Sequence, residues 1–135
     1  MRPLAICEEK MTNNKSFPKQ GEVWLINFKK LKETSKPYRP CLVISNNEQN
    51  EFDEEVIVSP LTTQEVIVGE VQLFEVLVEN NQETGLDEPS RILLNRIHTI
   101  DKELRLIKRL GKVDSEIWSQ VWKALWIVFA GKKLS

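Results

Sequence analysis

The chain has 135 residues, of which 41% are hydrophobic and 29% are charged, and its formal net charge at pH 7 is −1. This composition is typical of one globular domain, and it excludes a disordered chain or a protein that attracts nucleic acid through a large overall positive charge. Two cysteines and one histidine give neither a disulfide framework nor a zinc-binding spacing. We therefore expect a cytoplasmic protein that needs no metal or other cofactor and does not enter a membrane.

The first half of the chain predicts three strands. Residues 1–19 lack apolar periodicity and are predicted to form a flexible arm before a single domain at 20–131 and a polar tail at 132–135. The segments "EVWLINF" (22–28), "PCLVIS" (40–45) and "EVIVSPL" (55–61) are rich in β-branched or aromatic residues, as strands are. A lysine-rich loop, "KKLKETSKPY" (29–38), separates the first two. An acidic turn region, "NNEQNEFDE" (46–54), precedes the third.

The second half predicts further short strands and one helix. The segment "EVIVGEVQLFEVLVE" (65–79) is interrupted by Gly69 and predicts two strand pieces, while "SRILLN" (90–95) and "LRLIKRLGKV" (104–113) predict one strand each. Apolar residues then recur at helical spacing between Asp114, a suitable N-cap, and Gly131, a suitable C-cap. The predicted fold is mainly β, a small barrel closed by one C-terminal α-helix.

Three tryptophans, Trp118, Trp122 and Trp126, are spaced four residues apart along the predicted helix. We interpret this stripe as a packing surface, against the barrel or against a second subunit. The alternative is a platform on which nucleic-acid bases stack, but such aromatic residues usually lie beside basic ones, and only Lys123 is interleaved here.

Six pieces of the sequence occur in an order that resembles the MazF/PemK family of toxin endoribonucleases. They are "GEVWLINF", "RPCLVIS", "VIVSPLTT", "SRILLN" followed by "TID", "KRLGKV" and the C-terminal helix, together spanning about Gly21 to Phe129. The resemblance implies a small SH3-like barrel of the CcdB/MazF type that acts as a homodimer. It also implies cleavage of single-stranded RNA without a metal, and inhibition by a small acidic antitoxin.

The resemblance also implies catalytic roles for Arg39 and Thr62, with Thr63 as the alternative if the register differs by one. In the family's reaction the ribose 2′-hydroxyl attacks the adjacent phosphate, giving a 2′,3′-cyclic phosphate and a 5′-hydroxyl. A guanidinium offers several donors in a fixed fork to the charge that develops on the phosphate, and a hydroxyl can hold the phosphate or orient the attacking group. Without the resemblance, Arg39 would be a surface ion-pair residue and the threonines would be turn residues.

Further residues are candidates for RNA binding: Lys29, Lys30, Lys32, Glu33, Lys36, Asn95 and His98. The lysines suit phosphate contacts, although a solvated charged loop is the alternative. Asn95 stands where some members of the family carry a carboxylate suggested as a base, and an amide cannot serve in that way. His98, in a predicted turn, could act as an acid or base, or could have a structural role.

Two other functions remain open from the sequence. One is a toxin similar to CcdB, which binds DNA gyrase and cleaves nothing. The other is a member of the MazF/PemK family that has lost catalysis and only binds RNA or an antitoxin. The atypical loop at 29–38, which lacks a glycine, and Asn95 favour the second of these alternatives.

Overall fold

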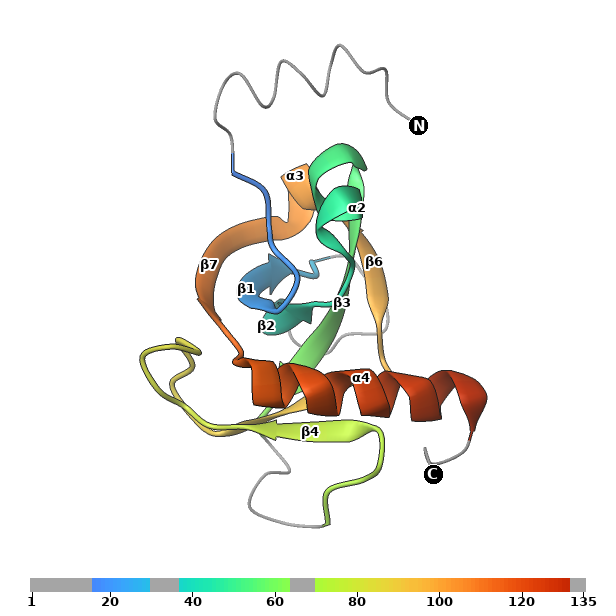
Figure 1. Cartoon of the computed structure of the whole chain (residues 1–135). Coiled ribbons are helices and arrows are strands. Elements are labelled where there is room, and N and C mark those ends of the chain that lie inside the picture. Colours follow the sequence, from blue (N-terminus) through green and yellow to red (C-terminus); the bar gives the residue numbers. More distant parts are fainter. Residues whose placement is uncertain (1–15, 30–36, 64–69, 132–135) are drawn as a thin grey trace.

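The computed structural model describes residues 16–29, 37–63 and 70–131, and the strands in these ranges form one antiparallel sheet (Figure 1). The strands are β1 (Glu22–Asn27), β2 (Tyr38–Val43), β3 (Glu55–Thr62), β4 (Glu75–Val78), β5 (Ser90–Leu93), β6 (His98–Asp101) and β7 (Leu106–Lys112). Their order across the sheet is β4-β5-β3-β2-β1-β7, and β6 also pairs with β3. The predicted fold class, a mainly β protein with a C-terminal helix, is confirmed.

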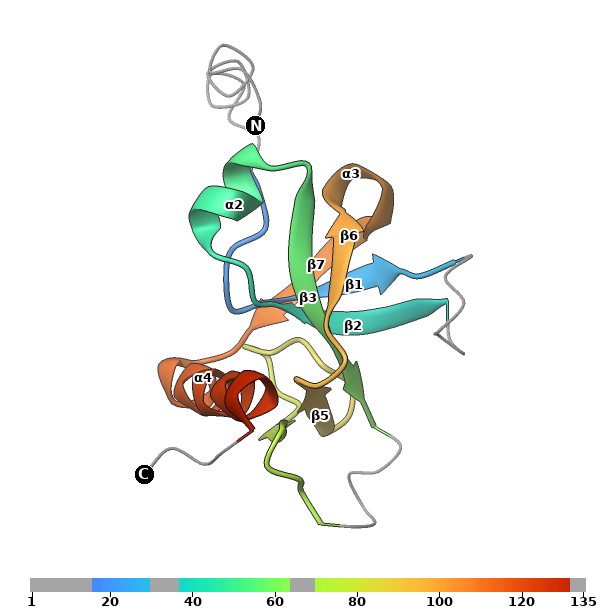
Figure 2. The ribbon, with the colours of Figure 1, turned by 90° about the vertical axis from the view of Figure 1, so that its right-hand side faces the viewer.

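Strand β3 is the centre of the sheet. One edge pairs with β2, while the other pairs with β6 over residues 55–58 and with β5 at Leu61 and Thr62. The β1–β2 hairpin projects from the molecule on the side away from the C-terminal helix (Figure 2). The end of β3, the start of β2 and the start of β5 are therefore brought together, although they are far apart in the sequence.

The apolar runs of the central strands are buried on both faces. On β2, Leu42 packs in one core cluster, whereas Cys41 and Val43 pack in another. The larger cluster lies between the sheet and the C-terminal helix, and the smaller one lies in the hollow of the coiled sheet. Because successive strand residues point to opposite faces, a strand buried on both faces has the continuous apolar pattern seen in "CLVI".

Two parts of the sequence prediction are wrong. The predicted acidic turn region contains a short helix, α2 (Asn47–Phe52), which Asn46 caps by accepting a hydrogen bond from the Gln49 amide at 2.8 Å. The predicted turn that contains His98 is strand β6, which is followed by a one-turn helix, α3 (Lys102–Arg105). Residues 65–69 of the predicted strand pieces lie outside the described part of the chain, and the described remainder of that segment contains β4.

The C-terminal helix α4 (Ser115–Ala130) forms as predicted. The Asp114 carboxylate accepts a hydrogen bond from the Ile117 amide, and Gly131 ends the helix in the left-handed conformation at φ 73°. The face of α4 that packs on the sheet is not the tryptophan stripe. It is the row Ile117, Val121, Ala124, Leu125 and Val128, which Trp118 joins from its edge. In the described residues, no helix is both long and apolar enough to cross a membrane.

The loop between β4 and β5 crosses β7 so closely that each of the two segments needs a glycine at the crossing. Gly85 has a φ of 70°, and a Cβ atom there would collide with the Leu110 carbonyl oxygen, while a Cβ atom on Gly111 would collide with the Glu83 carbonyl oxygen. The Lys112 amide donates to the same Glu83 oxygen at 2.8 Å. This contact covers the C-terminal end of β7, which is otherwise at the edge of the sheet.

We expect Gly85→Ala to lower the free energy of unfolding by about 2–5 kcal/mol, because it adds left-handed backbone strain to a collision with main-chain atoms. Urea unfolding measures this loss. Gly131→Ala is the matched control: its φ is similarly positive, but nothing lies within 4 Å of the added Cβ. It should therefore cost only about 1 kcal/mol. Equal losses for the two variants would contradict the close crossing.

Candidate active site

Arg39 lies at the start of β2, opposite Ile26 of β1. Its side chain is half-buried, and Nη2 donates a hydrogen bond to the Leu61 carbonyl oxygen at 2.9 Å. This contact crosses from β2 to the end of β3. One amino group of the guanidinium is thus held by the main chain, and within the described part of the molecule no other acceptor is recorded for it. The described residues thus fix the guanidinium through one amino group and leave its other donors available for an anion.

Thr62 is the last residue of β3 and is half-buried. The pairing of Cys41 with Pro60, continued by two residues in the antiparallel register, places Thr62 level with Arg39. Level residues on neighbouring strands point to the same face, with Cβ atoms about 4.5–5.5 Å apart. The next residue, Thr63, lies in a bend beyond the end of the strand. The strand register therefore favours Thr62 over Thr63 as the residue beside the guanidinium.

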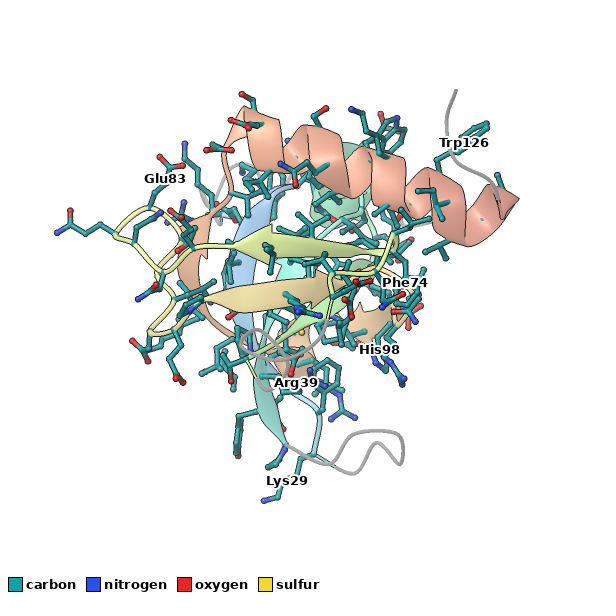
Figure 3. The ribbon with its side chains drawn as sticks, turned by 90° about the horizontal axis from the view of Figure 1, so that it is seen from below. Lys29, Arg39, Phe74, Glu83, His98 and Trp126 are labelled. Atoms are coloured by element: carbon teal, nitrogen blue, oxygen red, sulfur yellow. The ribbon has the colours of Figure 1, made fainter. Side chains whose placement is uncertain are left out.

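His98 lies on the same face of the sheet as Arg39 and Thr62. It opens β6 opposite Val58, and its ring packs on Phe28 with the ring centroids 5.1 Å apart. Phe28 follows β1, and its amide bonds to the Pro37 carbonyl, so it is the diagonal neighbour of Arg39. Phe28, which is almost fully buried, thus lies between Arg39 and His98 at one end of the smaller core. In Figure 3, Arg39 and His98 both lie on the side of β4 and β5 away from α4.

The other predicted RNA-binding residues are only partly described. Lys29 is exposed beyond the end of β1, farther out than Arg39 in Figure 3, and its carbonyl oxygen accepts a hydrogen bond from Arg105 Nη1 at 2.7 Å. Asn95 is exposed in the turn between β5 and β6, and no described contact joins it to Arg39 or Thr62. The remaining candidates lie outside the described residues; they are Lys30, Lys32, Glu33 and Lys36.

Cys41 lies two residues after Arg39 and faces the smaller core. Burial raises the pKa of the Cys41 thiol far above its ordinary value, and the nearby Arg39 charge offsets only part of this effect. The thiol therefore stays protonated and is not a nucleophile. In the described ranges, no group of three or more His, Cys, Asp or Glu side chains is placed to hold a metal ion.

The sequence did not predict a buried ion pair beside this site. Arg91 of β5 pairs with Thr62 in the sheet and forms a 3.1 Å ion pair with Glu75 of β4. A charged residue inside the apolar run "SRILL" is unusual, because arginine is almost never fully buried unless it is paired. The arginine inside this apolar run was the signal that Arg91 has a buried partner. The sequence alone does not identify Glu75 as that partner, because the identification depends on the strand order.

Solved structures similar to this chain show the class of fold. An endoribonuclease in complex with its cognate antitoxin, from a mycobacterial species, matches with a TM-score of 0.67 and 21% identity, over 87% of this chain and 99% of that chain. MazF from Deinococcus radiodurans matches with a TM-score of 0.70 and 19% identity, over 86% of this chain and 99% of that one. The Mycobacterium tuberculosis toxin MazF-mt6 matches with a TM-score of 0.65 and 20% identity, over 81% and 96%. The sheet and helix described above therefore form a MazF-type fold.

The family follows from the sequence. The family model of PemK-like, MazF-like toxins of type II toxin–antitoxin systems matches residues 19–129. The chain belongs to this family. Among curated proteins, none matches the sequence.

Proposed function

We propose that this protein is an endoribonuclease that cleaves single-stranded RNA at short specific sequences, using the 2′-hydroxyl of the RNA as the nucleophile. The observation that carries the proposal is the half-buried Arg39 guanidinium, held 2.9 Å from the Leu61 carbonyl oxygen and level with Thr62. The family match and the similarity to a solved mycobacterial endoribonuclease support it. A gyrase-binding toxin would need no such pairing of a guanidinium with a hydroxyl.

In the proposed mechanism, Arg39 acts on the scissile phosphate. As the 2′-oxygen loses its proton and attacks the phosphorus, negative charge gathers on the non-bridging oxygens, and the arm of the guanidinium that is not bound to Leu61 donates to them. The P–O5′ bond then breaks and the 5′-oxygen takes up a proton, which gives the 2′,3′-cyclic phosphate and the 5′-hydroxyl. The hydroxyl of Thr62 holds the phosphate or orients the attacking group from the neighbouring strand. Since the donors are positioned before the reaction, they stabilise the transition state without reorganising. Lys29 lies where it can bind another phosphate, farther along the RNA.

The experiment that tests this proposal is incubation of the purified protein with a long RNA of mixed sequence in EDTA, followed by mapping of the ends. We expect cleavage at a few sequence contexts, with 2′,3′-cyclic phosphate and 5′-hydroxyl ends. An intact RNA in the presence of folded protein would contradict the proposal. In that case, inhibition of gyrase would support the CcdB-like alternative, and RNA or antitoxin binding without cleavage would support a member that has lost catalysis.

We also propose that a small acidic antitoxin inhibits the protein, as one of the solved relatives was determined with its cognate antitoxin. An acidic segment would bind the cationic surface at Arg39 and Lys29, and would fold as it binds. Antitoxin binding and RNA cleavage should therefore compete, which a titration of cleavage rate against antitoxin measures. A ternary complex that still cleaves RNA at the full rate would contradict this arrangement.

We expect a homodimer at micromolar concentration. On α4, Trp122, Trp126 and Phe129 lie at i, i+4 and i+7 and are 63%, 52% and 73% exposed, although they are large and apolar. A contiguous exposed apolar surface of this kind marks an interface. Sedimentation should give a species of twice the chain mass, and Trp126→Glu should shift it to the monomer. A wild-type protein that sediments only at 15.7 kDa would contradict the prediction.

A further inference from the structure

The ion pair between Arg91 and Glu75 is almost completely withdrawn from water. Arg91 Nη1 lies 3.1 Å from Glu75 Oε1, and the side chains are 3% and 6% exposed. Removing two charges from water is costly, and a well-packed apolar pair is often equally stable. Stability alone therefore does not account for this pair, and its position suggests another role.

The pair lies in the same row of the sheet as the candidate active site. Arg91 is the direct partner of Thr62 on one side and of Leu77 on the other, and Glu75 is its diagonal neighbour on β4. Since directly paired residues point to the same face, Arg91, Thr62 and Arg39 follow one another across three neighbouring strands. The two charges of the pair neutralise each other, so Arg91 does not compete with Arg39 for a phosphate.

The pair fastens residues 70–75 to β5. Arg91 Nη1 also donates to the Glu70 carbonyl oxygen at 3.1 Å, and Glu75 Oε1 accepts from the Gln72 amide at 3.0 Å. Core packing holds little of this segment, because Val71 and Leu73 are 43% and 55% exposed and Phe74 is only half-buried. The buried polar contacts therefore fix where the chain lies as it returns to β4.

We infer that Arg91 and Glu75 are positioning residues for the cleavage reaction, an inference that rests on the proposed function. They hold residues 70–75 against β5, and β5 in turn pairs with the end of β3 through Arg91 with Thr62 and Ile92 with Leu61. The Leu61 carbonyl is the acceptor that orients the Arg39 guanidinium, and Thr62 is the next residue. The Arg91–Glu75 ion pair therefore acts as a clamp. It sets the position of both candidate catalytic groups without touching the RNA.

The first test replaces both members of the pair with apolar residues of similar volume, Arg91→Met with Glu75→Leu. This change leaves no buried charge without a partner, so the protein should fold. We expect kcat to fall by about 10-fold to 10²-fold, since small displacements of reacting groups have effects of this size, with KM nearly unchanged. The matched control is Arg109→Met with Glu22→Leu, which removes the 2.7 Å ion pair between β7 and β1. The control should cleave at the wild-type rate.

The second test asks whether the clamp acts through Thr62. In a Thr62→Ala background, the same pair replacement should lower kcat much less than it does in the wild type, because residues that act as a unit are non-additive. Full additivity, or a folded pair variant with the wild-type kcat, would overturn the inference.

Amide hydrogen exchange separates this inference from the proposed function. The pair replacement should speed exchange at Leu61 and Thr62, and the Arg109 and Glu22 control should not. If the wild-type protein cleaves no RNA, the proposed function fails, but faster exchange at the end of β3 would still support positioning by the clamp. Unchanged exchange at these two amides would overturn it, whatever the activity.

Discussion

Arg39→Ala should reduce the rate of RNA cleavage by at least about 10²-fold, because it removes a preorganised charged donor from the developing negative charge on the phosphate. The protein should remain folded. Arg39 is only half-buried, and its recorded contact among the described residues is the one hydrogen bond to the Leu61 carbonyl oxygen, a loss of about 1 kcal/mol. Single-turnover cleavage of a short RNA substrate, with circular dichroism for the fold, measures both effects.

Arg39→Lys is the informative companion variant. An ammonium can donate to the Leu61 carbonyl or to the phosphate, but it cannot hold a fixed fork that reaches both. We therefore expect it to fail nearly as badly as Arg39→Ala. Thr62→Ala should cost less, because it removes a neutral hydrogen bond rather than a charged one. Arg109→Ala, on the exposed edge strand, is the control that keeps full activity. A folded Arg39→Ala protein with the wild-type rate would refute the catalytic assignment.

The fold could be predicted from the sequence wherever burial is continuous along an element. Strands β1, β2, β3 and β5 are recognisable because their apolar and β-branched residues fill two cores, and α4 because its caps and apolar spacing agree. Strand β7 was also predicted, although most of its residues are exposed and only Leu106 and Leu110 pack against the cores. Helix α2 was missed because it is six residues long and mostly polar. A helix this short depends on its cap and on tertiary contacts, such as the buried Asn50 that bonds to Ser45, rather than on a periodic apolar face.

The candidate site could be predicted only where single residues carry the signal. Arg39 and Thr62 stand at strand ends in recognisable segments, and their proximity follows from the pairing of β2 with β3. Contacts between distant segments could not be predicted. The ring contact of His98 with Phe28 requires the sheet to coil, and the ion pair of Arg91 with Glu75 requires β4 and β5 to be neighbours. Trp122 and Trp126 do not pack on the sheet, since another row of α4 faces the core, and packing against a second subunit stays a prediction.

A single 2′-deoxy substitution on the 5′ side of the cut should abolish cleavage while leaving binding almost unchanged. Burial keeps the Cys41 thiol near Arg39 protonated, so this thiol is not the nucleophile. The attacking group in the proposed reaction is the 2′-hydroxyl of the RNA, and its removal leaves the phosphate bound but unreactive. Binding should persist because phosphate contacts to residues such as Arg39 and Lys29 do not involve the missing oxygen.

The test compares cleavage of two RNAs that differ only at that sugar, with their affinities measured by fluorescence anisotropy. A 2′-deoxy substitution one nucleotide away is the matched control and should be cleaved normally. Cleavage of the substituted bond at an undiminished rate would show that water or a protein group is the nucleophile, and would refute the proposed mechanism even if Arg39 proved essential.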